Sequence, residues 1–408
     1  MRAMNKLVYP ALIAFALAAP TVPVATQSAA FAQPEQSSEQ RQVSAATSGP
    51  WSAERVGQML AYVNRLDAEG LTPAAYGPDR LRAAMGADEA TRTRIADETF
   101  LKLAADLSGG SVRGRDRESW YMAPSGADEA QRQRLLAQAK HGNVTEVLDG
   151  LLPTHPQYIL LRRALAQTAA GDTAKRDLIR TNMERWRWLP RNLGQRHVIV
   201  NVPAFTAAIV DNGNVIARHR AVVGAVATPT PQLSATIVAV TMNPWWTVPQ
   251  SIVRTMRGFG GYEVRNGNGF RTVRQPPGPR NALGRLKIEM PNEHAIYLHD
   301  TPSQHLFSQA RRAYSHGCIR THNVREFAAT LLAPTGQWGR AQIDSTINAG
   351  RTVQARMAAP IPVYIAYFTA AATNDGNIVS YGDVYGRDGR VRQALNNMPS
   401  NRATASAN

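Results

Sequence analysis

The spacing of apolar residues divides the chain into a helical half followed by a strand-rich half. From Trp51 onward, apolar residues recur at the three- and four-residue intervals of amphipathic helices. Gly70 and Gly109-Gly110 stand where helices should end, and Thr72-Pro73 has the composition of a helix start. This pattern predicts a helical scaffold domain over residues 51–185. The positions that carry it are Val56, Met59, Leu60, Val63, Phe100, Leu103 and Leu107, with the stretches 128–140 and 156–188.

Near Pro190 the pattern changes to short runs rich in β-branched residues, which are typical of strands. Asp-Asn-Gly-Asn at 211–214 and Asn-Asp-Gly at 374–376 predict hairpin turns, and residues 324–332 predict a helix. We therefore expect an α+β protein, in which the helical domain precedes a mostly antiparallel β domain over residues 186–395. The expected strands cover residues 197–202, 205–210, 215–223, 236–241 and 361–368.

A Gly-, Pro- and Arg-rich excursion interrupts the β domain at about residues 251–285. It is longer than an ordinary loop, and long insertions of this kind often act as lids over a site. The sequence therefore predicts a lid-like insertion in the β domain.

The first 32 residues are predicted to be a signal peptide. Arg2 and Lys6 precede an apolar run over residues 7–20, and Ala30-Phe31-Ala32 is a cleavage site of the A-x-A type. The run is too short and too interrupted by proline to make a good membrane span, although an uncleaved anchor is the alternative. A polar linker at 33–50 and a disordered tail at 396–408 complete the predicted organisation. We expect the mature protein to be exported.

The formal net charge of +16 indicates a basic surface. Such a surface suits nucleic acid, an anionic membrane or an acidic polymer. Export excludes nucleic acid as the partner. An anionic cell-wall polymer is therefore the expected partner, with a merely solvated surface as the alternative.

Cys318 is the single cysteine of the chain and lies in Ser315-His316-Gly317-Cys318. A lone cysteine in an exported protein is either buried or reactive. A neighbouring imidazole generates thiolate, and both His316 and His299 are candidates that the sequence does not separate. Gly317 lets the backbone bend closely under the sulfur, where N–H groups hold an oxyanion. The sequence predicts a cysteine acyl-transfer site.

Two motifs, Tyr297-Leu-His299-Asp-Thr-Pro302 and Ser315-His-Gly-Cys-Ile-Arg320, make the chain resemble the L,D-transpeptidase family with a YkuD-type catalytic domain. The larger periplasmic branch of that family, with its helical N-terminal scaffold, is the closer match. Five further stretches carry this resemblance, namely Arg185-Trp-Arg-Trp-Leu-Pro190, Val200-Asn-Val-Pro-Ala-Phe205, Asn243-Pro-Trp-Trp-Thr-Val-Pro249, Gln275-Pro-Pro-Gly-Pro-Arg-Asn-Ala-Leu-Gly284 and Asp383-Val-Tyr-Gly-Arg-Asp388.

The resemblance implies a YkuD-like β-sandwich or barrel and a peptidoglycan L,D-transpeptidase. Cys318 would attack the diaminopimelate carbonyl of a tetrapeptide stem, release D-alanine and pass the acyl group to another stem's diaminopimelate amine, giving a 3→3 crosslink. His299 would be the base, and the N–H groups of Gly317 and Cys318 the oxyanion hole. Ser315 and His316 would support the cysteine loop. Carbapenems would acylate the same sulfur.

Five residues are predicted to contact substrate, each with a structural alternative. A guanidinium suits carboxylate geometry, so Arg320 is expected to bind a substrate carboxylate, or else to form a structural salt bridge. Tyr297 and Trp246 are expected to wall the donor groove, or else to belong to the core. Asn281 and Gly284 are expected to line the site, or else to shape a turn.

Rival functions share some of these residues. An L,D-carboxypeptidase, or an enzyme that attaches or detaches a lipoprotein, would use the same nucleophile with another acceptor. A non-catalytic peptidoglycan-binding protein would not need it. A zinc protein would use Cys318 and nearby histidines as ligands, although their spacings form no recognised paired-ligand motif. We expect no cofactor and no metal, stem peptides and other cell-wall synthesis proteins as partners, and a periplasmic location.

Overall fold

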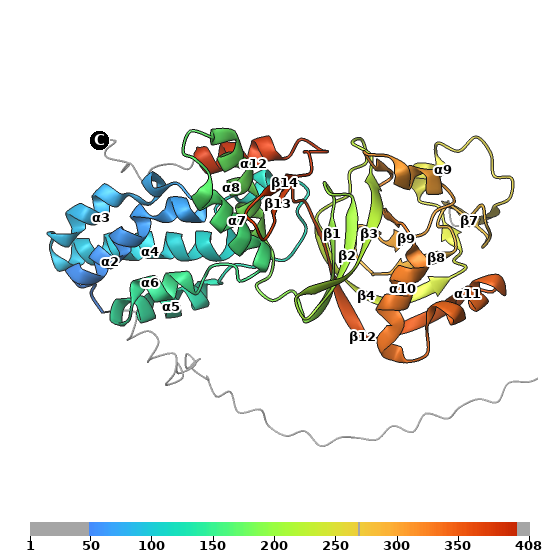
Figure 1. The fold of residues 1–408 in the computed structure, drawn as a ribbon, viewed down its shortest axis with the longest axis horizontal. Helices are drawn as coiled ribbons and strands as arrows, with labels where there is room; N and C mark the ends of the chain where they lie inside the picture. The colour runs from blue at the N-terminus through green and yellow to red at the C-terminus, as the bar shows by residue number, and fades with distance from the viewer. Residues whose placement is uncertain (1–48, 268–269, 398–408) are drawn as a thin grey trace, which may run out of the picture.

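The computed structural model describes residues 49–267 and 270–397, in which a helical part from α2 to α8 precedes a β-rich part (Figure 1). This order, and the mostly antiparallel pairing of the strands, confirm the predicted fold class. The predicted signal peptide, nearly all of the predicted linker and most of the predicted tail lie outside the described residues. None of the described helices is long and apolar enough to cross a membrane.

The helical part begins at α2 and ends at α8. Ser52 caps α2 and Asp128 caps α5, where Gln131 completes a capping box. The predicted pattern over residues 156–188 divides into two helices around Gly171-Asp172, because the Asp172 side chain caps the second one. The helices are α2 Ala53–Asn64, α3 Pro78–Met85, α4 Glu89–Gly109, α5 Glu129–His141, α6 Val144–Asp149, α7 Pro156–Gln167 and α8 Thr173–Trp188, with 3-10 turns at Leu66–Glu69, Pro73–Tyr76 and Gly114–Asp116.

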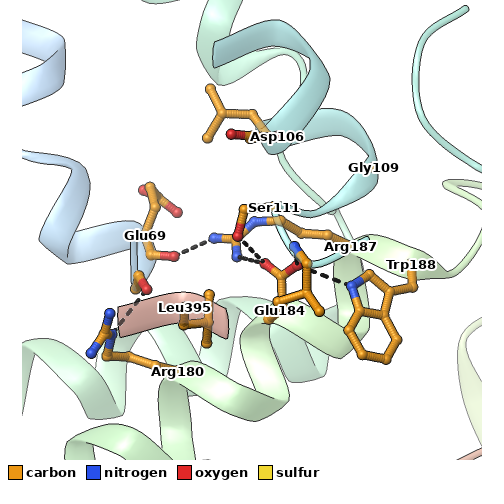
Figure 2. A network of polar contacts seen from close by, with 12 residues as sticks. Glu69, Asp106, Gly109, Ser111, Arg180, Glu184, Arg187, Trp188 and Leu395 are labelled. Atoms are coloured by element: carbon orange, nitrogen blue, oxygen red, sulfur yellow. Dashed lines mark hydrogen bonds and ion pairs between the residues drawn. The ribbon is translucent and has the colours of Figure 1, made fainter. Parts of the chain in front are cut away.

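A buried ion pair holds the end of this part together (Figure 2). Arg187 and Glu184 of α8 have fully buried side chains with a nitrogen–oxygen distance of 3.1 Å. Glu184 also accepts hydrogen bonds from the Val112 N–H at 2.8 Å and from the Trp188 indole at 3.0 Å. Arg187 donates to the Glu69 carbonyl and to the Tyr158 hydroxyl. Segments far apart in sequence thus meet at one charged pair.

Among the described residues, the main sheet has nine strands in the order β10-β3-β11-β9-β8-β4-β12-β1-β2, and it closes on itself because β2 also pairs with β3. The predicted turn at Asn212-Gly213 joins β2 to β3, with both residues at positive φ. The strands are β1 Arg196–Asn201, β2 Thr206–Asp211, β3 Asn214–Gly224, β4 Leu233–Met242, β8 Leu286–Glu289, β9 Leu298–His299, β10 Ala313–Ser315, β11 Ile319–Thr321 and β12 Val353–Ala366.

One face of the sheet packs with two helices around an apolar core. These helices are α10 Val324–Leu332 and α11 Arg340–Asn348. Alternation along each strand therefore decides which residues enter this core and which lie on the opposite face. Core members include Val198, Val240, Ile288, Leu298, Ile319, Phe327 and Ile343.

The predicted lid region, about residues 251–285, provides two strands of a small sheet beside the main one, and the third strand comes just before it. The strands of this sheet are β5 Trp246–Thr247, β6 Glu263–Gly267 and β7 Phe270–Gln275, in the order β5-β7-β6, with α9 Gln250–Val253 following β5. Val248, Val253 and Val273 form its small core. The region lies at the end of the molecule opposite the helical part (Figure 1). Its role as a lid stays a prediction.

After β12 the chain returns to the helical part. There the hairpin of β13 Ala370–Ala372 and β14 Ile378–Ser380 is followed by α12 Asp388–Asn396, which lies beside α8 (Figure 1). Val391 and Leu395 of α12 are buried in the core of the N-terminal helices. The sequence assigned residues up to 395 to the β domain, whereas this segment packs on the helices, so the two parts are joined at both ends of the β domain.

Candidate active site

Strand register brings the predicted nucleophile and one of the two candidate bases to the same face of the sheet. β11 pairs in parallel with β9, with Ile319 opposite Leu298 and Arg320 opposite His299. Ile319 and Leu298 are fully buried in the core. Their neighbours along each strand therefore point to the other face, which carries Cys318, Arg320, Tyr297 and His299.

The loop between β10 and β11 holds Cys318 through the Ser315 hydroxyl. Ser315 Oγ donates to the Cys318 carbonyl at 2.5 Å and accepts from the Gly317 N–H at 3.2 Å. Gly317 has φ of +109°, and a β-carbon there would lie 3.2 Å from Ile296 Cδ1. Only glycine meets both conditions without strain. These contacts agree with the expected supporting role of Ser315.

The two expected oxyanion donors are in different situations. Gly317 N–H already donates to the buried Ser315 hydroxyl. Cys318 N–H has no hydrogen-bond acceptor among the residues that the structure describes. Cys318 N–H is therefore the free one of the pair, and an oxyanion hole formed by both groups stays a prediction.

The Cys318 thiol is partly buried and lies 3.7 Å from the Ala295 carbonyl oxygen. Burial raises its pKa above the ordinary value of 9.0. Hydrogen bonding by Tyr297 and the charges of Lys287 and Arg320 act in the opposite direction without cancelling the shift. The resting group is thus a protonated thiol at neutral pH.

His299 is a buried, neutral imidazole. Burial, and then the nearby Arg320 charge, lower its pKa to about 3. Backbone groups of Asp300 and Leu283 oppose this shift. The ring lies at 5.6 Å from the Tyr297 ring, centroid to centroid. A neutral imidazole on the face of the thiol is able to accept its proton.

His316, the other candidate base, has an exposed side chain. It lies in the tight loop before Cys318, where residues two apart need not share a face. The register therefore favours His299 over His316 as the base, and the supporting role expected of His316 stays a prediction.

Arg320 lies beside this pair without a counter-ion. The structure has no carboxylate within ion-pair distance of its guanidinium among the described residues, and its Nε is buried without a hydrogen-bond partner. Burial lowers its pKa, and the Cys318 sulfur opposes that shift. The salt-bridge alternative thus finds no partner there, and a cation remains available to an anionic group.

Tyr297 lies next to the sulfur, and Trp246 lies next to Tyr297. Burial and the Cys318 sulfur raise the pKa of the Tyr297 hydroxyl, while hydrogen bonding from Trp246 lowers it. Trp246 belongs to β5 of the small sheet and is half-buried. Tyr297 thus connects Trp246 to the site, and the role of both residues as groove walls stays a prediction.

Asn281 and Gly284 shape the turn before β8. The Asn281 amide donates to the Pro244 carbonyl at 3.1 Å and to the Pro276 carbonyl at 2.9 Å. Gly284 has φ of +62°, and a β-carbon there would collide with the Asp300 side chain. These are the contacts of the turn alternative, and substrate contact by either residue stays a prediction.

Lys287 is a member of the site that the sequence analysis missed. It pairs with His299 across β8 and β9, and its Nζ lies 4.6 Å from the centre of the Tyr297 ring and 2.8 Å from Glu289. The available signal was the alternation of Leu286, Lys287, Ile288 and Glu289, which puts the two charges on one face.

Two other features do not coincide with this site. Across the described residues, no three His, Cys, Asp or Glu side chains are arranged to hold a metal ion. A cavity of 1130 Å³ lies between the helical part and β1–β2, and none of the predicted site residues lines it.

Two family models match parts of the chain. Residues 195–358 match the YkuD model, described as the L,D-transpeptidase catalytic domain, and residues 48–165 match a model described as a Scaffold domain. A Haemophilus influenzae protein named putative L,D-transpeptidase is 29% identical over 242 residues, which are 52% of this chain and 48% of that protein. The chain thus spans about half the length of this curated relative.

Solved structures of similar proteins include two from mycobacteria. An L,D-transpeptidase from Mycobacterium smegmatis is 13% identical and aligns over 42% of this chain and 58% of its own, with a TM-score of 0.23. L,D-transpeptidase 3 from Mycobacterium tuberculosis is 16% identical and aligns over 42% of this chain and 60% of its own, also with a TM-score of 0.23.

Proposed function

We propose that the chain is a peptidoglycan L,D-transpeptidase with Cys318 as nucleophile, because residues 195–358 match the YkuD model and residues 48–165 match the Scaffold model. The observation that carries the proposal is the shared sheet face of Cys318, His299 and Arg320, which the parallel pairing of β9 with β11 sets. A thiol and a neutral base are the groups that attack a carbonyl carbon, and the unpaired cation suits a carboxylate of the substrate.

In the first half-reaction, His299 takes the Cys318 proton as the sulfur attacks the carbonyl carbon of diaminopimelate in a tetrapeptide stem. The raised thiol pKa and the lowered imidazole pKa mean that the proton moves during the attack and not before it. The bond to the D-alanine nitrogen then breaks, and the protonated imidazole returns its proton to the leaving amine. A thioester remains on Cys318.

In the second half-reaction, the side-chain amine of another stem's diaminopimelate attacks the thioester carbonyl. His299 accepts the amine proton, the carbon–sulfur bond breaks, and the thiolate is reprotonated. The product is a 3→3 crosslink. Arg320 binds a carboxylate of the stem peptide, which its lack of an internal counter-ion supports.

The substrate implies an exported enzyme, in line with the signal peptide expected over residues 1–32. Cell-wall synthesis proteins would then be neighbours in the periplasm. The strained carbonyl of a carbapenem would acylate Cys318 by the same first half-reaction.

Analysis of the products tests the proposal. The mature protein is incubated with disaccharide-tetrapeptide, and the muropeptides are separated and identified by mass spectrometry. The proposal requires dimers with 3→3 linkage and release of D-alanine. Tripeptide without dimers would replace it by an L,D-carboxypeptidase, and unchanged tetrapeptide would favour the non-catalytic alternative.

A further inference from the structure

The segment between β14 and α12 contains a polar cluster around Asp383. None of the residues in this cluster has a role in the proposed reaction. The Tyr367 hydroxyl donates to Asp383 Oδ1 at 2.5 Å and accepts from the Tyr385 N–H at 2.7 Å. Asp383 also accepts from the Arg387 and Asp388 N–H groups, each at 2.8 Å. The turn is thus closed on itself by a single carboxylate.

This cluster is attached to α8 of the helical part. Arg185 Nη1 donates to Asp388 Oδ1 at 2.5 Å, and its guanidinium lies 5.0 Å from the centre of the Tyr367 ring. Arg387 lies 4.9 Å from the ring centres of both Tyr367 and Tyr385, and its side-chain nitrogens have no hydrogen-bond partner among the described residues. Arg185 of α8 thus contacts Tyr367, and Arg387 at the start of α12 contacts both tyrosines.

The Tyr385 hydroxyl reaches from this cluster into the β domain. It donates to the Gly224 carbonyl at 2.7 Å and accepts from the Thr230 N–H at 3.1 Å. Thr230 is fully buried, and its Oγ1 accepts from the Gly224 N–H at 2.8 Å. The same Oγ1 donates to the Gly317 carbonyl at 2.8 Å. Two residues thus link the C-terminal cluster to the residue before Cys318.

The Gly317 carbonyl and the Cys318 N–H belong to one planar peptide group. Fixing the carbonyl oxygen therefore fixes the direction of the N–H on the other side of the plane. This N–H is the free member of the expected oxyanion pair. The turn over residues 224–230 also holds the Ser315 backbone carbonyl, two residues before Gly317, because Ala225 N and Thr228 Oγ1 donate to it at 2.8 Å and 3.0 Å.

We infer that Thr230 and Tyr385 are positioning residues, which orient the Cys318 N–H toward the developing oxyanion. Through Tyr385, the orientation of this N–H depends on the C-terminal cluster that Arg185 of α8 holds. Neither residue touches the reacting atoms. The inference uses the proposed function only for the identity of the acyl donor, because any acyl transfer to Cys318 passes through an oxyanion.

Two probes of the same sulfur separate this role from a structural one. Acylation by p-nitrophenyl acetate passes through a tetrahedral oxyanion, whereas alkylation by iodoacetamide does not. Wild type and the variants Thr230→Val, Thr230→Ser and Tyr385→Phe are compared with Tyr364→Phe. Tyr364 is a matched control, because its hydroxyl also donates to a backbone carbonyl, that of Leu193 at 3.3 Å, away from this network.

We expect Thr230→Val to slow acylation by about tenfold to a hundredfold, Tyr385→Phe by about threefold to tenfold, and neither to change alkylation by more than about twofold. Thr230→Ser and Tyr364→Phe should keep the wild-type ratio of the two rates. Parallel loss of both rates, or unchanged acylation in both variants, would overturn the inference. Tyr385→Phe decides alone if Thr230→Val does not fold.

A protein that fails to crosslink stem peptides but shows this selective loss would refute the proposed function and keep the inference. If wild type crosslinks stem peptides and acylation is unchanged in the variants, the proposed function stands and the inference is refuted.

Discussion

At the scale of single residues, environment sets the protonation of the site. Burial holds a proton on the Cys318 sulfur and keeps one off His299. The resting pair is therefore neutral, unlike a thiolate–imidazolium pair. The sulfur becomes nucleophilic only as the proton passes to the imidazole during attack.

The neutral pair has a measurable pH dependence. The pKa of Cys318 lies above its ordinary value of 9.0, and only thiolate reacts with iodoacetamide. We expect the alkylation rate to keep rising with pH through 9, as followed by mass spectrometry of the Cys318 peptide. An alkylation rate that stays constant between about pH 5 and 8 would instead indicate a thiolate–imidazolium pair and contradict the assignment of a neutral pair.

The two histidines provide a second test at this scale. We expect His299→Gln to lower the rate of acylation by about 10²- to 10⁴-fold, because it removes the general base. His316→Gln is the matched control and should cost less than about fivefold, because its side chain is exposed. The measurement is thioester formation under single-turnover conditions. A larger loss in His316→Gln would move the base to that residue.

At the scale of elements, the parallel pairing of β9 with β11 makes the site. The sequence predicted the hairpin at Asn212-Gly213, because turn chemistry is local. It did not predict this register, because the two strands are short and separated by a loop that carries no pairing signal. The choice between His299 and His316 depended on that register, and so did the place of Lys287.

The end of α8 is an element whose stability depends on one ion pair. Glu184→Ala would leave the fully buried Arg187 guanidinium without its carboxylate. We expect the free energy of unfolding to fall by about 3–5 kcal/mol, as measured by urea denaturation.

The control for this variant is Glu98→Ala, which removes an exposed partner of Arg94 on α4. It should cost less than about 1 kcal/mol. An equal fall in the free energy of unfolding in the two variants would show that the buried pair stabilises the protein no more than an exposed pair does.

At the scale of the whole molecule, the chain returns from the β domain to the helices. The apolar residues that anchor α12, Val391 and Leu395, are too few to identify its partner from the sequence. Their neighbours in space come from the first half of the chain. The sequence therefore assigned this segment to the β domain, and only the structure shows Tyr385 between the helical part and the cysteine loop.

This arrangement gives the helical part a connection to the chemistry. α8 holds the tyrosine cluster through Arg185, and the cluster holds Thr230, which bonds the Gly317 carbonyl. The helical part and the β domain are thus expected to act as one unit in acyl transfer, and not as a catalyst with a passive support.

The most direct test of the account is the mass of the intact protein after incubation with disaccharide-tetrapeptide. The account predicts an adduct equal to the substrate minus D-alanine, located on Cys318 by peptide mapping and absent from Cys318→Ala. It also predicts that Cys318→Ala keeps the stability of wild type within about 1 kcal/mol. An adduct on another residue, or the same adduct on Cys318→Ala, would contradict the assignment of the nucleophile.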